Sequence, residues 1–394
     1  MNAGDKETYE MPGKLYATPR QVTNLEDCLF YHSMNIPGHG LVTGNWDILG
    51  NESQYIGEVP LKDKRVIEIG PGSGLLSFFM EREGAEVVSL EVSEDFRWDF
   101  YWDLQDAVPV DIGARREVQQ TDIEKMKNSY WFCHKVFSSK AKVHYGSAYN
   151  IPEGLGKFDI SVLCCILLHN KHPLQILENC ARVTSETVVI TEPFRKRPIP
   201  QASMEFRPTD NQHSWHTWWG FAPDFFVNVL RSMGFPHIGV TFHTQQQLGR
   251  SINLFTVVGS RNALAKTQSS DYPVNVQIKC PVEQLKIAKG ESFSLPLNIV
   301  NMDETPLSPF VENPLLLSYR WKQASGEVVE LSAIRTPLPR TLYKGDQENI
   351  SMTIQSPPSP GNYLLEITML KKGITWYDKK YSGLLPKIKT SVTL

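Results

Sequence analysis

Three glycines in the run Gly70-Pro-Gly-Ser-Gly74 form the part of the sequence best suited to holding a ligand. Glu68 lies two residues before the first glycine, and Glu91 stands 17 residues after the last one. Glycines let a ligand approach the backbone, and a helix that follows them offers free N–H groups at its first turn. A carboxylate at the tip of the next strand can accept hydrogen bonds from ribose hydroxyls. The pattern predicts a site for a nucleoside-containing cofactor.

The segments around this loop have the pattern of a strand, a loop, a helix and a second strand. Arg65–Gly70 predicts a buried strand, Leu75–Glu83 a helix and Glu86–Glu91 a strand. Such βαβ units build parallel sheets whose ligands lie beyond the carboxyl ends of the strands. The other predicted strands are Lys142–Tyr145, Phe158–Leu163, Thr187–Thr191, His237–His243 and Asn253–Val258, and the other predicted helical stretches are Ile123–Val136, Pro173–Val183 and Pro223–Met233. The last two strands leave no room for a helix between them, so we expect them to pair antiparallel.

The spacing of the glycines distinguishes two classes of cofactor. A dinucleotide fingerprint, GxGxxG, would need Gly or Ala at Leu75, whereas the sequence has GxGxG preceded by an acid. With Glu91, the loop resembles motif I and the acidic ribose contact of class I methyltransferases that use S-adenosylmethionine (SAM). The resemblance implies a doubly wound, Rossmann-like α/β sheet of seven strands with the last strand antiparallel, and S-adenosylhomocysteine (SAH) as the product. It assigns cofactor contacts to Glu68, Gly70, Pro71, Gly72, Ser73, Gly74, Glu91, Ser147, Ala148 and Cys165.

A narrower resemblance runs through residues 28–260. Its motifs are Phe30–Ser33 (FYHS), Gly40–Asp47 (GLVTGNWD), Leu167–His169, Trp219–Pro223 (WGFAP) and Phe255–Gly259 (FTVVG). They are similar to a branch that contains the tRNA wobble-uridine carboxymethyltransferases and methyltransferases of bacterial surface-polysaccharide gene clusters.

Two departures from these families affect the cofactor. The tRNA enzymes use a carboxylated SAM, whose extra carboxylate needs cationic or phenolic partners. Leu168 stands where they carry Tyr, and Arg250 is left to match one basic partner, so we expect ordinary SAM. Many class I enzymes also have an acid after the third strand for the adenine amino group. This chain has Gly146-Ser-Ala148 there, so either Ser147 or a backbone group takes that role, or the adenine is recognised less tightly.

Three residues are candidates for the chemistry. Methyl transfer from a sulfonium is an in-line displacement, and a hydroxyl acceptor also needs a base. His169 follows the fourth strand and Glu192 follows the fifth, so both should face the cleft, and His32 lies in the segment before the sheet. For His169 a hydrogen bond that closes its loop remains the alternative, and for Glu192 a role in holding its loop.

Contacts to the acceptor are expected from the N-terminal segment and from a run of aromatics and histidines. Tyr31, His32, Asn45 and Trp46 precede the sheet, where such segments either fold over the cofactor or pack against the core. The run His213-Ser-Trp-His-Thr-Trp-Trp219 suits a sugar ring or a base, or packing under the sheet edge. Two histidines without a third ligand predict no metal site. The predicted substrate contacts are Tyr31, Trp46, His213, His216, Trp219 and Arg250.

The pattern changes after about residue 270. Short β-branched or aromatic runs alternate with Pro, Gly, Asn and Asp, which predicts an all-β sandwich. Leu317–Trp321, Arg335–Pro339, Pro360–Tyr363 and Ile374–Trp376 resemble the immunoglobulin-like β-domains fused to bacterial surface-glycan enzymes. A polar linker, Ala263–Tyr272, separates the parts and predicts few contacts between them. We expect an N-terminal lid segment at 1–60, a methyltransferase domain at 61–262 and an immunoglobulin-like domain at 271–394. For the last, glycan binding, dimerisation and structural support stay open.

Composition narrows the setting. The chain has 394 residues, with 40 Lys+Arg against 43 Asp+Glu, which gives no strong electrostatic reason to bind nucleic acid. The six cysteines form no CxxC pair, and the longest apolar run, Ile160–Leu168, is too short to span a membrane. We expect a cytoplasmic enzyme that methylates a hydroxyl, or an amine, of a saccharide, nucleotide sugar or glycan precursor. A tRNA-modifying enzyme and a non-catalytic SAM-binding protein are the alternatives, and a homodimer stays open.

Overall fold

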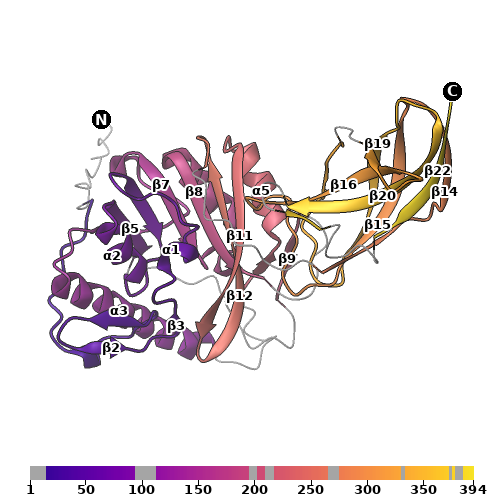
Figure 1. The fold of residues 1–394 in the computed structure, drawn as a ribbon. Helices are drawn as coiled ribbons and strands as arrows, with labels where there is room; N and C mark the ends of the chain where they lie inside the picture. The colour runs from indigo at the N-terminus through magenta and orange to yellow at the C-terminus, as the bar shows by residue number, and fades with distance from the viewer. Residues whose placement is uncertain are drawn as a thin grey trace, which may run out of the picture.

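The computed structural model describes residues 15–93, 112–194, 202–208, 217–264, 275–329, 333–371, 375–377 and 385–394. They form two parts (Figure 1). The first, up to residue 264, is a mixed sheet covered by helices. The second, which we call the C-terminal β region (described residues 275–394), consists of strands. No helix among the described residues has the length and apolar character needed to cross a membrane.

The first part is built on one sheet. Its strands are β3 (Trp46–Asp47), β4 (Arg65–Ile69), β5 (Glu86–Val92), β6 (Lys142–Gly146), β7 (Phe158–Cys164), β8 (Thr184–Pro193), β11 (His237–Gln247) and β12 (Arg250–Ser260). Their order is β3-β11-β12-β8-β7-β4-β5-β6, and β12 runs antiparallel to both of its neighbours. The Rossmann-like mixed sheet is therefore confirmed. The expected count of seven strands is wrong by one, because the two-residue β3 pairs with the tip of β11.

Helices pack on this sheet in the order expected of βαβ crossovers. The helices are α1 (Glu52–Tyr55), α2 (Leu75–Arg82), α3 (Ile112–Val136), α4 (Pro173–Val183) and α5 (Pro223–Ser232), with 3₁₀ turns η1 (Leu25–Asp27), η2 (Glu153–Leu155) and η3 (Leu167–His169). The crossovers from β4 to β5 and from β7 to β8 lead in opposite directions along the sheet, so right-handed connections place α2 and α4 on opposite faces. Both α4 and α5 begin with proline, which is favoured at a helix start. Helix α3 begins at Ile112, well before the predicted Ile123.

The N-terminal segment is built into the first part. It contains a hairpin of β1 (Met34–Ile36) and β2 (Gly40–Val42) that lies beside α3 (Figure 1). The Leu29 N–H donates to Ser129 Oγ of α3 at 3.0 Å, and Phe30 and Trp46 belong to the same apolar core as the sheet. A further small hairpin, β9 (Met204–Phe206) with β10 (Trp219–Phe221), lies outside the main sheet.

The C-terminal β region has two sheets around a core of its own, in which Trp321 is 1% exposed. One sheet has the order β13-β15-β19. The other has the order β14-β22-β20-β16-β17, with β18 added to β16 and β21 to β20. The strands are β13 (Val276–Lys279), β14 (Gln284–Ala288), β15 (Ser292–Asn301), β16 (Leu315–Gln323), β17 (Val328–Val329), β18 (Thr336–Pro337), β19 (Gln347–Gln355), β20 (Gly361–Lys371), β21 (Thr375–Trp376) and β22 (Lys387–Thr393). The side chains of β14 are all half-buried or exposed.

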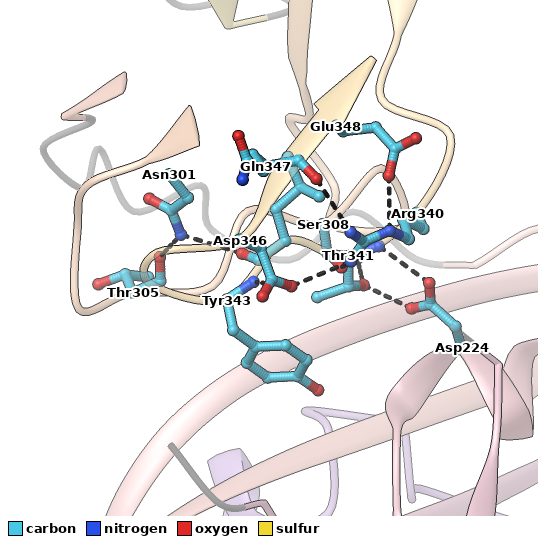
Figure 2. Close-up of polar contacts among 11 residues, drawn as sticks. Asp224, Asn301, Thr305, Ser308, Arg340, Thr341, Tyr343, Asp346, Gln347 and Glu348 are labelled. Atoms are coloured by element: carbon cyan, nitrogen blue, oxygen red, sulfur yellow. Dashed lines mark hydrogen bonds and ion pairs between the residues drawn. The ribbon is translucent and has the colours of Figure 1, made fainter. Parts of the chain in front are cut away.

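The two parts meet in a packed contact that we call the seam, made by Asp224, Val240, Phe310, Thr341 and Tyr343. The Asp224 carboxylate is 6% exposed and accepts hydrogen bonds from the N–H of Thr341, at 2.9 Å, and from its hydroxyl (Figure 2). The Val240 N–H donates to the Phe310 carbonyl at 3.0 Å. The polar linker predicted few contacts across the boundary, and at the seam this expectation is wrong.

Candidate functional site

A cavity of about 660 Å³ lies at the carboxyl ends of β4, β5 and β7. The N-terminal segment and α3 supply its remaining walls. It brings together eight residues that the sequence predicted for the site: Tyr31, His32, Glu68, Gly70, Gly72, Glu91, Cys165 and His169. Residues far apart in the sequence therefore meet at the edge of the sheet where ligands of open α/β folds bind.

The glycine loop needs its glycines for two different reasons. Gly70, Gly72 and Gly74 all have positive φ angles, of 69°, 55° and 87°, which side chains of L-residues rarely adopt. A Cβ atom on Gly70 would lie 2.3 Å from Ile166 Cδ1, so that glycine also permits close packing. A Cβ on Gly72 would meet no protein atom closer than 3.4 Å, yet Gly72 lines the cavity. Gly72 therefore keeps backbone open toward a ligand.

Ser73 ties the N-terminal segment to this loop. Its buried hydroxyl accepts a hydrogen bond from the Tyr31 N–H at 2.6 Å. The indole N–H of Trp46 donates to Tyr31 Oη at 3.2 Å, and the Trp46 backbone N–H donates to the Tyr31 carbonyl at 2.8 Å. Trp46 does not itself line the cavity and instead holds Tyr31 there. Pro71, Ser73 and Gly74 likewise support the loop without lining the cavity.

Glu68 begins a buried chain of hydrogen bonds. The Ser77 hydroxyl donates to its carboxylate, Ser77 and Ser89 share a hydrogen bond of 2.9 Å, and Ser89 and Tyr130 share one of 3.0 Å. Burial raises the pKa of Glu68 to about 7, and the Ser77 hydrogen bond opposes that rise. The chain joins β4, α2, β5 and α3, so it holds the carboxyl group of Glu68 in a fixed place at the wall of the cavity.

Glu91, the last residue but one of β5, lies at another wall of the cavity. One of its oxygens accepts the Val92 N–H at 2.7 Å. Burial raises its pKa, while hydrogen bonds from backbone N–H groups, at Val92 and Gly72, and the Lys127 ammonium oppose that rise. The carboxylate is thus fixed beside the glycine loop, where it can accept hydrogen bonds from a ligand's hydroxyls.

His32 has no hydrogen-bond partner among the described residues. It is 6% exposed and lines the cavity, and its Nδ1 is buried. Burial lowers the pKa of His32 to about 4, so its ring is neutral at pH 7. A neutral imidazole can accept a proton or a hydrogen bond from a ligand.

Cys165 has an unusual backbone conformation at the end of β7. Its φ is 53°, in the left-handed region that glycine prefers, and its Sγ lies 3.3 Å from Tyr55 Oη. Left-handed residues other than glycine concentrate at functional sites. The bend leads directly into η3, whose last residue, His169, lines the cavity.

Glu192 holds this same loop from behind. It is fully buried, lies outside the cavity lining, and accepts the Leu167 N–H at 2.9 Å. Burial raises its pKa to about 8, against the hydrogen bonds of backbone N–H groups at Leu167, Leu168 and Ile166. Of the two roles considered for Glu192, the geometry favours loop holding over substrate contact.

Several other predicted residues lie away from the cavity. Ser147 accepts the Tyr149 N–H at 3.2 Å, and neither it nor Ala148 lines the cavity. The Trp219 indole N–H donates to the Asn170 carbonyl at 3.0 Å, which secures β10 against the loop after η3. Arg250 is exposed beside the turn between β11 and β12. His213 and His216 lie outside the described residues.

The cavity also has walls that the sequence did not predict. Tyr55 comes from α1, and one face of α3 supplies Ala114, Val118, Gln119, Asp122, Ile123 and Met126. Asn45, which the sequence analysis named among the N-terminal residues that could fold over the cofactor, also lines the cavity. The available signal was the spacing of Val118, Asp122 and Met126 in steps of four, which puts them on one helix face. Because the residues between 112 and 122 are mostly polar, the predicted helix began only at Ile123.

Comparisons with known proteins found similarity to solved structures at low identity and low TM-score. No protein-family model matches the chain, and no curated protein matches its sequence. Among solved structures, the N-terminal domain of EvdMO1, determined in the presence of SAH and D-fucose, has 16% identity and a TM-score of 0.36, over 60% of this chain and 92% of that chain. Magnesium protoporphyrin IX methyltransferase from Synechocystis PCC 6803 with bound SAM has 12% identity and a TM-score of 0.33, over 53% and 76%.

A third solved structure belongs to the 1,6-didemethyltoxoflavin-N1-methyltransferase of Burkholderia thailandensis, with 1,6-didemethyltoxoflavin and SAH bound. It has 10% identity and a TM-score of 0.34, over 54% of this chain and 76% of that chain. Likeness at this level carries no argument about this chain. The function has to be argued from the cavity of this chain.

Proposed function

We propose that the chain is a SAM-dependent methyltransferase. The observation that carries the proposal is the meeting of Gly72 and Glu91 in one cavity at the carboxyl ends of adjacent parallel strands. The open backbone at Gly72 suits the methionine and ribose part of SAM, and Glu91 suits the ribose hydroxyls. The GxGxG spacing agrees with this, since no pyrophosphate has to be seated.

The residues of the cavity fit this cofactor. A side chain at Gly72 would enter the space that the ligand needs, although it would meet little protein. The carboxyl group of Glu68 is held next to the loop by the Ser77 hydroxyl, ready to accept hydrogen bonds from the cofactor's amino acid end. When bound, the cofactor supplies a methyl group on a sulfonium for in-line transfer to an acceptor.

His32 is our candidate for the base. With no intramolecular hydrogen bond among the described residues and a neutral ring, it could accept a hydrogen bond from an acceptor hydroxyl and take its proton. His169 lines the same cavity and is the second candidate. Tyr55 and Asn45 offer a hydroxyl and an amide to position the acceptor.

The lining favours an uncharged acceptor. Within the described ranges, no Lys or Arg lines the cavity, so a phosphate or carboxylate would find no cationic partner there. Hydroxyl, amide and imidazole groups suit the hydroxyls of a saccharide. This observation, with a formal net charge of −3, disfavours the tRNA alternative. The non-catalytic alternative offers no role for a buried, unpartnered imidazole in the cavity.

The proposal also includes a division of the chain into domains. We place the immunoglobulin-like domain at 271–394, the methyltransferase domain at 61–262, and the preceding segment as a wall of the site. The Tyr31–Ser73 hydrogen bond supports a lid role for that segment, because it fixes the segment directly on the glycine loop.

The first prediction tests the cofactor site. Glu91→Gln weakens a charge-assisted hydrogen bond, so SAM affinity should fall about tenfold or more, and Gly72→Val should abolish binding. Glu83→Gln, on an exposed acid at the end of α2, is the matched control and should bind normally. Isothermal titration calorimetry with SAM and SAH measures each affinity. Unchanged affinity in both site variants, or no binding by the wild-type protein, would contradict the proposal.

A further inference from the structure

One face of α3 lines the cavity and combines apolar with polar side chains. Val118, Ile123 and Met126 are the apolar members, and Gln119 and Asp122 are the polar ones. Positions three and four apart lie on the same helix face, so the five side chains form one surface. Val118 is 62% exposed, which is high for an aliphatic residue at a cavity wall.

The two polar side chains of this surface are unsatisfied within the protein. Among the described residues, neither the Gln119 amide nor the Asp122 carboxylate has a hydrogen-bond or ion-pair partner. Their neighbours on the helix do have partners: Glu124 pairs with Arg20 and with Lys127 at 2.8 Å. Polar groups that are half-buried in a cavity without partners are available to water or to a ligand.

The position of this surface relates it to Glu91. Lys127 Nζ lies 4.8 Å from the centre of the Tyr145 ring, and Tyr145 on β6 pairs with Glu91 on β5, so α3 passes the proposed ribose site at the level of Lys127. Asp122 is five residues nearer the start of the helix, which is about 7.5 Å along its axis. This length is similar to the distance from a ribose to the far edge of its base.

The usual source of base contacts is missing from the cavity. The third strand of the domain, β6, is followed by Ser147 and Ala148, which were expected to contact adenine but do not line the cavity. If a nucleoside binds at Glu91, another element must recognise its base. Helix α3 is the candidate, because its Gln119 amide and Asp122 carboxylate line the cavity without a partner among the described residues.

We infer that α3 binds the adenine of the cofactor. Asp122 accepts a hydrogen bond from the 6-amino group, Gln119 bonds the ring nitrogens, and Val118, Ile123 and Met126 pack against the ring. This rests on the proposed function and names a base-specificity determinant on an element outside the nucleotide-binding βαβ unit. The helix then both forms a wall of the cavity and recognises the base.

The test compares two ligands that differ at one group of the base. SAH carries the 6-amino donor, and S-inosylhomocysteine carries a carbonyl acceptor there. Calorimetry should show that the wild-type protein prefers SAH by about tenfold or more, because the analogue places an acceptor against the Asp122 carboxylate. Asp122→Asn should reduce the preference to near unity. Glu117→Gln, which removes the same charge from an exposed position of α3, should keep the wild-type preference.

The outcomes separate the two proposals. An unchanged preference in Asp122→Asn, with SAH still bound, overturns the adenine contact and leaves the cofactor proposal standing. If that variant instead raises only the KM of the acceptor, α3 binds the acceptor and the inference is wrong. If the wild-type protein binds neither ligand, the proposed function itself fails. Because Asp122 has no partner in the described structure, thermal denaturation of the variant should match the wild type and exclude misfolding as the cause.

Discussion

Thr341→Val should weaken the seam between the two parts of the chain. Valine keeps the shape of threonine but removes the hydroxyl that donates to the buried Asp224 carboxylate. A hydrogen bond to a charged group contributes about 1.5–3 kcal/mol, and Asp224 is only 6% exposed, so water can replace the lost bond only in part. The Thr341 N–H remains as a donor to Asp224, but the buried Ser308 hydroxyl also loses its hydrogen bond to the Thr341 hydroxyl, so the loss should lie toward the upper end of that range.

Urea unfolding, followed by tryptophan fluorescence and circular dichroism, measures the change in free energy. Thr353→Val makes the same substitution at an exposed position of β19, away from the seam, and should change stability by about 0.5 kcal/mol or less. Affinity for SAH should not change in either variant, because no seam residue lines the cavity. Equal stability of the two variants would refute the reasoning, since the Thr341 hydroxyl would then contribute nothing to joining the two parts.

Two further predictions concern the cavity and its support. His32→Gln should leave SAH affinity within about threefold and lower kcat by about 10²–10⁴-fold, measured as methyl transfer per folded molecule. His169→Gln should lower kcat less. If His169→Gln instead has the larger effect, His169 is the base. Burial raises the pKa of Glu192 from an ordinary 4.5 to about 8. The contribution of Glu192 to the free energy of unfolding is therefore full below pH 4.5 and is lost as the pH rises through 8. From about pH 5 to pH 8 the unfolding free energy of the wild type should fall with rising pH more steeply than that of Glu192→Gln, by up to about 1.4 kcal/mol per pH unit, while Glu68 contributes its own slope to both proteins. Equal slopes for both proteins, from urea titrations across that window, would contradict the assignment.

Local patterns sufficed to predict the nucleotide-binding unit. The strand, loop and helix from Arg65 to Arg82 follow from neighbouring residues: a β-branched apolar run, glycines where φ is positive, and an amphipathic turn. Helix α4 was predicted with its observed ends, because Pro173 starts it and its apolar residues repeat at helical spacing. The site residues Glu68, Gly72 and Glu91 belong to this local unit, which is why they could be named from the sequence.

Contacts between distant segments could not be predicted in the same way. The Tyr31–Ser73 hydrogen bond joins residues 42 positions apart, and nothing near either residue announces it. Glu192 was equally compatible with touching a substrate or holding a loop, and only the position of the Leu167 N–H favours the second role. The start of α3 was missed because a polar helix wall lacks the continuous apolar stripe that packing against a core produces.

Two aspartates show what the structure adds. In the sequence, Asp122 and Asp224 look alike, since each lies within a helix and precedes an apolar residue. In the structure, the Asp224 carboxylate is buried with two donors from Thr341, so its hydrogen-bonding capacity is used to join two parts of the chain. The Asp122 carboxylate lines a cavity with no partner among the described residues. A carboxylate whose bonds are made within the protein stabilises the fold, whereas one left open in a cavity is available to a ligand. Whether a polar group is satisfied, rather than which residue carries it, therefore separates the structural aspartate from the one proposed to read the cofactor.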